Sequence, residues 1–161
     1  MIKVVFVCTG NICRSPMAEA VMQDLVEKAG LSDQIEVDSA GIISYHSGEL
    51  ADPRARRVLA DHDIDYLGDA RKITEEDFEA DYLIGMSKEH VDELGWAKPR
   101  GTQPKIHLLL EFADDAFGQE VEDPYYAGGF DKTYELVEAG CKGLLEHIIQ
   151  EHHLTQNQSK S

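Results

Sequence analysis

The sequence predicts an α/β fold: a doubly wound (Rossmann-like), four-stranded parallel sheet with helices on both faces, in a single domain. Short apolar runs rich in β-branched residues alternate with longer segments whose apolar residues recur at helical spacing. The 161 residues are the length of one ordinary domain. We expect the domain to occupy residues 1–153 and the polar tail, 154–161, to be frayed.

The first half of the chain contains two predicted strand–helix units. A strand is expected over residues 2–7, which are apolar and largely β-branched, before turn formers replace them. A helix follows from Ser15-Pro16, with Ser15 as its N-cap, until Gly30 ends the apolar repeat. The second unit combines a short strand over 35–39 with a helix that opens at Asp52-Pro53.

The second half continues the alternation. Residues 80–86 are predicted to form a third strand, and Ser87 is placed to cap the helix that follows. Residues 105–110 are predicted as a fourth strand, although the same apolar run also suits a buried helical turn. A long amphipathic helix is expected from Phe130 to about His152.

Composition excludes several classes of function. The formal net charge of −16 argues against nucleic-acid and membrane partners. Residues 1–60 hold six Lys or Arg and eight Asp or Glu, a net charge of −2, so residues 61–161 carry −14. The first residues lack a signal-peptide pattern, which predicts a cytoplasmic protein. Three cysteines are too few for a disulfide-stabilised secreted scaffold, so we expect chemistry of them.

The loop after the first strand carries the strongest chemical signal, because ligands of doubly wound sheets bind beyond the carboxyl ends of the strands. It reads C-T-G-N-I-C-R-S-P from Cys8 to Pro16 and lacks the two common nucleotide-binding glycine patterns. A loop that leads into a helix points backbone N–H groups inward and suits a tetrahedral oxyanion. The same field favours a thiolate on Cys8, and Arg14 offers two parallel N–H donors to the anion.

The alternative interpretation makes Cys8 a buried strand-end residue and Arg14 a surface residue. The combination with Gly10, Asn11 and Ser15 in one loop favours the phosphate-binding interpretation. Asn11 tolerates a left-handed backbone and can cross-link the loop, and the Ser15 hydroxyl can donate to the Cys8 sulfur.

Cleavage of a phosphate ester also needs a proton donor for the leaving oxygen. Asp123 is the best candidate, because Pro124 restricts its backbone and two tyrosines, Tyr125 and Tyr126, follow to line the mouth of a site. Taken by itself, Asp-Pro is also a common start of a turn.

Together these segments resemble the low-molecular-weight protein tyrosine phosphatases. V-C-T-G-N-I-C-R-S-P at 7–16 is similar to the phosphate loop of that family, and D-P-Y-Y at 123–126 is similar to its general-acid loop. Weaker similarities at 38–41, 52–55 and 70–74 lie between them in the family's order, so the resemblance extends from about Ile2 to His152. The N-terminal position of the loop and the distant Asp-Pro make it specific.

The resemblance implies hydrolysis of phosphotyrosine and small aryl phosphates through a cysteinyl-phosphate on Cys8, with Arg14 holding the phosphate and Asp123 as general acid. It implies no cofactor and no metal. The expected partners are tyrosine-phosphorylated proteins, a tyrosine kinase among them, and an oxyanion in the loop. Substrate contacts are expected from Thr9, Gly10, Asn11, Ile12, Cys13, Ser15, Tyr45, Tyr125 and Tyr126, and loop support from Ser39 and Arg71.

Three positions qualify the resemblance. Gly68 stands where many members carry a histidine, and Ser87 stands where many carry an aspartate, so the support of the loop is expected to differ in detail. The third position, Ile12, is apolar as in the tyrosine-specific branch, whereas the arginine-phosphatase branch tends to carry threonine there.

Other functions remain as alternatives. Arsenate reductases share this fold and loop but need further cysteines, and Cys141 falls on the apolar face of the last helix. A phosphate-binding, redox-sensing module without turnover is the non-enzymatic alternative, in which Cys13 pairs with Cys8 as a redox partner. The histidines near the end of the last helix, His147 and His152-His153, lack the spacing of a helical metal site.

Overall fold

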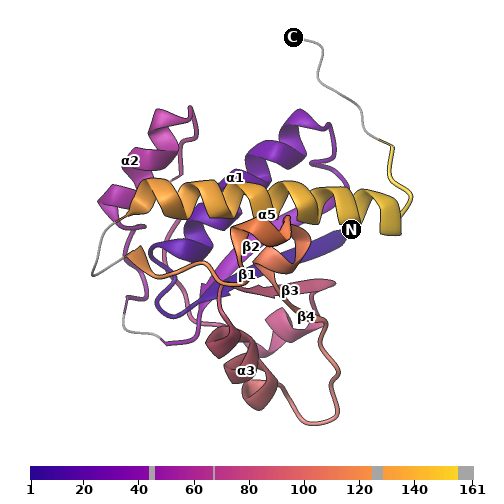
Figure 1. Cartoon of the computed structure of the whole chain (residues 1–161). Helices are drawn as coiled ribbons and strands as arrows, with labels where there is room; N and C mark the ends of the chain where they lie inside the picture. Colours follow the sequence, from indigo (N-terminus) through magenta and orange to yellow (C-terminus); the bar gives the residue numbers. More distant parts are fainter. Residues whose placement is uncertain (44–45, 67, 125–128, 156–161) are drawn as a thin grey trace.

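The sheet has the predicted architecture. The structure, a computed structural model, describes residues 1–43, 46–66, 68–124 and 129–155. The four strands run parallel in the order β2-β1-β3-β4 (Figure 1). They are β1 (Ile2–Cys8), β2 (Ile35–Gly41), β3 (Tyr82–Gly85) and β4 (Ile106–Leu108). The direction of winding reverses between β1 and β3, which makes the carboxyl end of β1 the expected ligand-binding point.

Helices cover both faces of the sheet. Helices α1, α2 and α5 lie together on one face, and α3 lies on the other (Figure 1). Their bounds are α1 (Arg14–Lys28), α2 (Pro53–Asp61), α3 (Lys88–Ala97) and α5 (Phe130–Glu151). Short 3-10 helices complete the chain at η1 (Glu75–Glu79), η2 (Leu109–Phe112) and η3 (Asp115–Phe117).

Strand β1 separates two hydrophobic cores. Val4 and Phe6 point into the larger core under α1 and α5, while Val5 and Val7 point into a smaller core that contains Leu94 of α3. This alternation follows from the two-residue period of a strand. Because both faces are covered, β1 is apolar at four consecutive positions, as in other parallel sheets.

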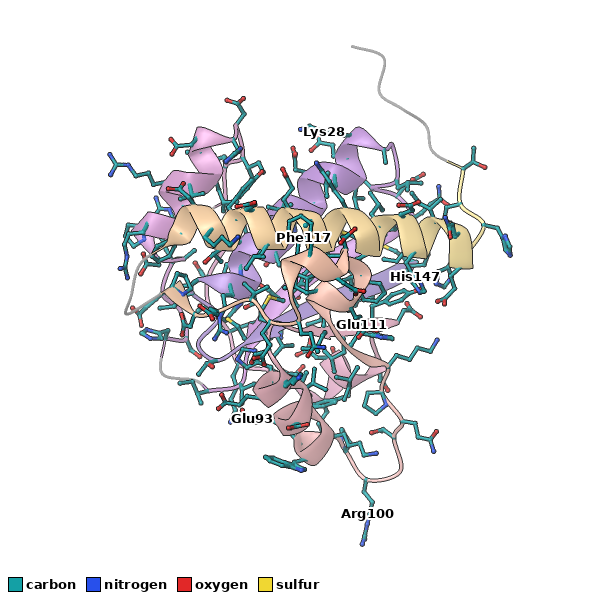
Figure 2. All side chains as sticks on the ribbon, viewed as in Figure 1. Lys28, Glu93, Arg100, Glu111, Phe117 and His147 are labelled. Carbon is teal, nitrogen blue, oxygen red and sulfur yellow. The ribbon has the colours of Figure 1, made fainter. Side chains whose placement is uncertain are left out.

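The carboxyl end of α5 lies at the opposite edge of the sheet from the end of β1. There Tyr82, the first residue of β3, donates a hydrogen bond to Glu151. His147 and Glu111 lie at the same end (Figure 2), and the rings of Phe112 and His147 are 5.1 Å apart. Among the described residues, no group of three His, Cys, Asp or Glu side chains is placed to hold a metal ion. None of the described helices is long and apolar enough to cross a membrane.

Two predicted details were wrong. Helix α1 begins at Arg14 with Cys13 as its N-cap, so Ser15 lies inside the first turn and its hydroxyl serves other partners. Strand β4 ends at Leu108, because residues 109–112 form the buried helical turn that was the alternative for this run. The remaining predicted helices and strands are present, within a few residues of their expected bounds.

Candidate active site

The loop of residues 9–13 joins the end of β1 to the start of α1, at the reversal of winding. Neighbouring segments hold its backbone from outside. The carbonyl oxygens of Cys8 and Thr9 accept from Ile42 and Ile43 at 3.0 Å each, and that of Ile12 accepts from Asp52, the N-cap of α2, at 2.7 Å. The loop is therefore fixed to the exits of β2 and to the start of α2.

Gly41, at the end of β2, permits the closest of these approaches. A Cβ atom at this position would lie 3.0 Å from the carbonyl carbon of Gly10 and 3.0 Å from the carbonyl oxygen of Thr9. Any larger residue would push against loop backbone, which has no flexible end to move aside. The glycine thus allows β2 to brace the loop directly.

Inside the loop, hydrogen bonds converge on the Cys8 sulfur. Cys8 Sγ lies 2.9 Å from Ser15 Oγ, and Asn11 Nδ2 donates to Ser15 Oγ at 2.8 Å. Asn11 adopts the expected left-handed backbone, with φ of 58°, and is buried. Its second amide hydrogen is directed to Ser39 Oγ at 3.0 Å. One asparagine side chain therefore connects the cysteine's hydrogen-bonding partner to strand β2.

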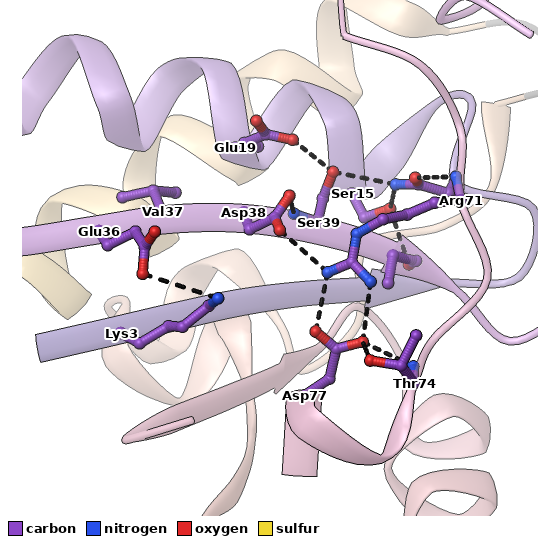
Figure 3. A network of polar contacts seen from close by, with 12 residues as sticks. Lys3, Ser15, Glu19, Glu36, Val37, Asp38, Ser39, Arg71, Thr74 and Asp77 are labelled. Atoms are coloured by element: carbon purple, nitrogen blue, oxygen red, sulfur yellow. Dashed lines mark hydrogen bonds and ion pairs between the residues drawn. The ribbon is translucent and has the colours of Figure 1, made fainter. Parts of the chain in front are cut away.

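This network continues beyond the expected residues to Glu19 on α1 (Figure 3). The Ser39 hydroxyl donates to Glu19 Oε1, and the hydroxyl of Tyr66 donates to the same oxygen at 2.9 Å. Burial raises the pKa of Glu19, and the hydrogen bonds from Ser39 and Tyr66 oppose that rise. The sequence analysis missed Glu19 and Tyr66, since nothing local connects them to the loop.

Arg71 supports the loop from the opposite side of Asn11. Its backbone N–H donates to Asn11 Oδ1 at 3.0 Å, which fixes the orientation of the amide. Its guanidinium lies between Asp38 and Asp77, with closest distances of 3.0 and 2.8 Å (Figure 3). Burial by itself would raise the pKa of Asp77, but the hydrogen bonds and charge of Arg71, with hydrogen bonds from Thr74, lower it below its usual range.

Arg14, buried at the start of α1, brings the general-acid candidate to the loop. Its Nη1 donates to the carbonyl oxygen of Val121 at 3.1 Å, and its Nη2 lies 3.5 Å from Asp123 Oδ2. The Asp123 carboxyl is 40% exposed, so it borders both the loop and solvent. The structure thus brings Asp123 to Arg14 and the loop after Cys8, from which it is separated by over a hundred residues in the chain.

His90 lies beside Thr9 of the loop and beside Arg14, and it was not predicted from the sequence. Its Nε2 lies 3.0 Å from Thr9 Oγ1 and 3.4 Å from Arg14 Nη2, while its Nδ1 accepts from the backbone N–H of Ser87 at 3.3 Å. Burial and the Arg14 charge lower its pKa to about 4. The S-x-x-H spacing of Ser87 and His90 after a strand was the one available signal, because it is a helix-capping pattern at the carboxyl edge of the sheet.

The other two cysteines are buried free thiols. Cys13 lies in the loop itself, and burial, together with nearby Asp52 and Cys8, raises its pKa. Its pairing with Cys8 stays a prediction. Cys141 is fully buried in the larger core, and its pKa is also raised by burial. Cys141 therefore has no exposed thiol to offer the relay that arsenate reduction needs.

The remaining expected residues are accounted for as follows. Thr9, Gly10 and Ile12 form the loop with those already described, and a Cβ atom on Gly10 would meet the His46 ring at 2.9 Å. The three tyrosines expected to line the site fall outside the described residues: Tyr45, Tyr125 and Tyr126.

The sequence matches a family of phosphatases over nearly its whole length. Residues 3–155 match the family described as low molecular weight phosphotyrosine protein phosphatase. The chain belongs to this family. Low molecular weight phosphotyrosine protein phosphatase 2 of Drosophila melanogaster is 44% identical over 147 residues, which are 89% of this chain and 90% of that protein.

Solved structures of this phosphatase family have the same fold. A protein tyrosine phosphatase from Entamoeba histolytica superposes with a TM-score of 0.88 at 36% identity, covering 96% of this chain and all of that one. A structure named as the Drosophila arginine phosphatase DARP superposes with a TM-score of 0.82 at 34% identity, covering 91% of this chain and 97% of that one. The fold is thus common to proteins named for two different phosphoryl substrates.

Proposed function

We propose that this protein hydrolyses phosphotyrosine and small aryl phosphate monoesters through a phosphorylated Cys8. The observation that carries the proposal is the convergence, at the end of β1, of the Cys8 sulfur, the Ser15 hydroxyl and the Arg14 guanidinium, with the Asp123 carboxyl beside it. A nucleophile, an anion-binding guanidinium and a proton donor are the parts that phosphate-ester cleavage requires.

In the proposed first step, the Cys8 thiolate attacks phosphorus and the bond from phosphorus to the phenolic oxygen breaks. The loop N–H groups and Arg14 hold the phosphoryl oxygens, where they stabilise the charge of the transition state. The electron pair of the broken bond remains on the phenolic oxygen, which takes a proton from protonated Asp123. The products of this step are a phenol and a cysteinyl-phosphate.

In the second step, water attacks the cysteinyl-phosphate. The Asp123 carboxylate takes a proton from the water, and the sulfur–phosphorus bond breaks to release inorganic phosphate and restore the thiolate. The Ser15 hydroxyl, 2.9 Å from the sulfur, stabilises the thiolate in both its departing and its attacking role. Apart from this water molecule, every group in the proposed cycle belongs to the chain or to the substrate.

The family supports phosphoproteins as substrates. We propose phosphotyrosine proteins in particular, including a tyrosine kinase among the partners, because the matching family and its Drosophila relative are named phosphotyrosine protein phosphatases. Ile12 supports the same choice: its apolar side chain cannot orient a water molecule toward a phosphoramidate, as a hydroxyl side chain could.

Rates on a matched set of substrates test this proposal. Peptides of one sequence carrying phosphotyrosine, phosphoserine or phosphoarginine are compared under reducing conditions, with arsenate as a further substrate. We expect phosphotyrosine to give the highest kcat/KM, Cys8→Ser to abolish turnover while still binding vanadate, and Asp123→Ala to lower kcat by about 10²- to 10⁴-fold for poor leaving groups. Faster turnover of phosphoarginine or arsenate would reassign the substrate, and residual turnover in Cys8→Ser would reassign the nucleophile.

A further inference from the structure

Tyr66 lies outside the phosphate loop, yet its hydroxyl ends the hydrogen-bond network that begins at the Cys8 sulfur. The residue follows α2 and is 8% exposed. Its hydroxyl donates to Glu19 Oε1 at 2.9 Å, and the Ser39 hydroxyl donates to the same oxygen. Two neutral donors therefore share one partly buried carboxylate oxygen.

Gly68 makes room for this tyrosine. A Cβ atom built on Gly68 would lie 2.6 Å from Tyr66 Cζ and 3.1 Å from its Cε1, with the hydroxyl oxygen closer still. Real Cβ atoms do not approach a ring this closely. Any side chain at position 68 would force the Tyr66 ring to move, so the glycine and the tyrosine act as a pair.

The hydrogen bonds of the network all have one consistent direction. Ser39 donates to Glu19, so its lone pairs face Asn11 Nδ2, which donates to it. The amide is held in that orientation because Asn11 Oδ1 accepts from the backbone of Arg71. Its other N–H then donates to Ser15 Oγ, which leaves the Ser15 hydrogen to the Cys8 sulfur at 2.9 Å or to the carbonyl oxygen of Ala40 at 3.4 Å, and the sulfur is the nearer acceptor.

That direction requires an acceptor at Glu19. If Glu19 were protonated on Oε1, the oxygen that Ser39 and Tyr66 share, it would present a donor to Ser39, and the Ser39 hydrogen would turn toward Asn11 Nδ2, which is itself a donor. The Asn11 amide would then lose its fixed orientation, and the Ser15 hydrogen would no longer be reserved for the sulfur. The charge state of Glu19 is thereby coupled to the cysteine through three polar side chains.

We propose that Tyr66, admitted by Gly68, is a positioning residue for the reaction at Cys8, whose hydroxyl keeps Glu19 ionised and the network directed toward the sulfur. This inference rests on the proposed role of Cys8 as nucleophile. Tyr66 touches no reacting atom, and it acts through Glu19, Ser39 and the loop.

The surroundings of Glu19 support this role. Among the residues that the structure describes, the groups that act on its charge are Gln23 on α1, Asp38 and Ser39 on β2, and Tyr66 after α2, and none of these is a cation. Burial raises the pKa of Glu19, the Asp38 charge adds to the rise, and hydrogen bonds from Ser39, Tyr66 and Gln23 oppose it. Removing the Tyr66 hydroxyl removes one of these opposing donors, so Glu19 would take up a proton at a higher pH.

The test is how the loss of kcat/KM in Tyr66→Phe depends on pH. In Tyr66→Phe we expect kcat/KM for an aryl phosphate to fall about fivefold at pH 5, the scale of one ordinary hydrogen bond, and to approach the parent value at pH 7.5. The rate of Cys8 alkylation by iodoacetate should show the same pattern. A deficit of equal size at every pH, or no deficit, would overturn the proposal, because loss of packing does not depend on protonation.

Glycine variants provide a matched control. Gly68→Ala should reproduce the deficit of Tyr66→Phe, and the double variant should be no worse than either. Gly95→Ala, on α3 with nothing within 4 Å of its added Cβ, should have no effect. An unaffected Gly68→Ala enzyme would show that the tyrosine position does not matter and would contradict the proposal.

Glu19→Gln separates charge from hydrogen bonding, because glutamine keeps an acceptor oxygen but cannot ionise. In this background, adding Tyr66→Phe should produce no pH-dependent change, and a pH-dependent deficit there would contradict the proposal. Circular dichroism and Tm establish that each variant is folded. Cys8→Ser in the parent protein tests the proposed function separately: turnover without the thiol would overturn that function, whereas a pH-independent Tyr66→Phe deficit would overturn the positioning role only.

Discussion

His90 is a buried base whose hydrogen bonds require it to be neutral. The backbone N–H of Ser87 donates to Nδ1, so this nitrogen carries no proton, and Nε2 lies 3.0 Å from Thr9 Oγ1. An imidazolium would place a second hydrogen against the Ser87 N–H and a positive charge 3.4 Å from Arg14 Nη2. Burial and Arg14 accordingly lower the pKa of His90 to about 4.

This makes stability depend on pH in a predictable direction. An unfolded histidine binds a proton near pH 6.5, the folded one only near 4, so the unfolded state gains protons first as pH falls. Between pH 7.5 and 5.0 the folded state should lose about 2 kcal/mol through His90. Urea unfolding of the parent and His90→Gln at both values measures this, with His153→Gln as the control for loss of one imidazole. The prediction would be contradicted if the free energy of unfolding changed equally between the two pH values in the parent and in His90→Gln.

At the residue scale, the sequence was enough to predict contacts between residues that are close together in the chain. Cys8, Asn11 and Ser15 lie in one short stretch of the sequence, so their types and spacing were enough to anticipate the hydrogen bonds among them. Glu19, Tyr66 and His90 could not be found this way, because each reaches the loop from a different element. Their roles depend on how α1, α2 and α3 pack on the sheet, and only long-range packing brings them together.

At the element scale, α1 illustrates how a functional contact displaces a structural one. Ser15 before Pro16 is typical of an N-cap, and local propensity favours that assignment. In the structure the Ser15 hydroxyl instead lies 2.9 Å from the Cys8 sulfur and accepts from Asn11. Helix α1 therefore begins at Arg14, two residues before the predicted first helical residue, Pro16, and no side chain caps it. The local pattern predicted the helix correctly but misplaced its first residue, because it gives no sign that the Ser15 hydroxyl is bound to residues of the preceding loop and strand.

Arg71 joins two elements to the loop, and Asp77 is the partner that holds it. Asp77, buried at the first turn of η1, accepts from both Nη atoms of Arg71 at 2.8 and 2.9 Å. In Asp77→Asn an amide would present N–H donors to a guanidinium, so Arg71 would keep Asp38 as its remaining ionic partner. The backbone bond from Arg71 to Asn11 would then be less well fixed.

We expect Asp77→Asn to destabilise the fold by about 2 kcal/mol at neutral pH, the scale of a broken part-buried charge pair. Since the folded pKa of Asp77 is lowered, its contribution is fully present above the unfolded value, about 4, and is lost as pH falls through the folded value. In denaturant unfolding, the difference in unfolding free energy between the parent and Asp77→Asn should therefore be the same at pH 7.5 and pH 5 and smaller at pH 3. Asp65→Asn, at an exposed position, is the control. A difference that grows in acid would have the wrong sign.

At the scale of the whole molecule, most of the negative charge lies in a different part of the sequence from the phosphate-binding loop. The net charge of −16 would seem to exclude an anionic ligand, yet residues 1–60, which contain the loop, carry only −2. At physiological salt, charges beyond about 8 Å are largely screened. Phosphate binding is therefore decided by the loop N–H groups and Arg14, whereas the acidic body decides which substrates approach. That division predicts selectivity for the flanking sequence of a peptide.

A cavity beside the general-acid candidate gives this selectivity a structural basis. Its volume is about 610 Å³, and Glu120, Glu122 and Asp123 line it together with Lys88 and Lys132. Because Asp123 borders both this cavity and the Arg14 guanidinium, residues flanking a phosphotyrosine in the loop would come close to the two glutamates. Basic side chains of a peptide would be attracted to the glutamates there, whereas acidic side chains would be repelled.

Peptides with Arg or Lys beside the phosphotyrosine should therefore be hydrolysed with a higher kcat/KM than peptides with Asp or Glu there, by roughly tenfold at low salt, the scale of one or two screened charge contacts. The preference should fall as ionic strength rises, because these contacts are exposed. Glu120→Gln combined with Glu122→Gln should reduce it without altering the rate on p-nitrophenyl phosphate, which has no flanking residues. Steady-state rates at two salt concentrations measure both effects. A preference for acidic flanks, or one independent of salt, would mean that local contacts other than charge select the substrate and that the acidic body has no part in it.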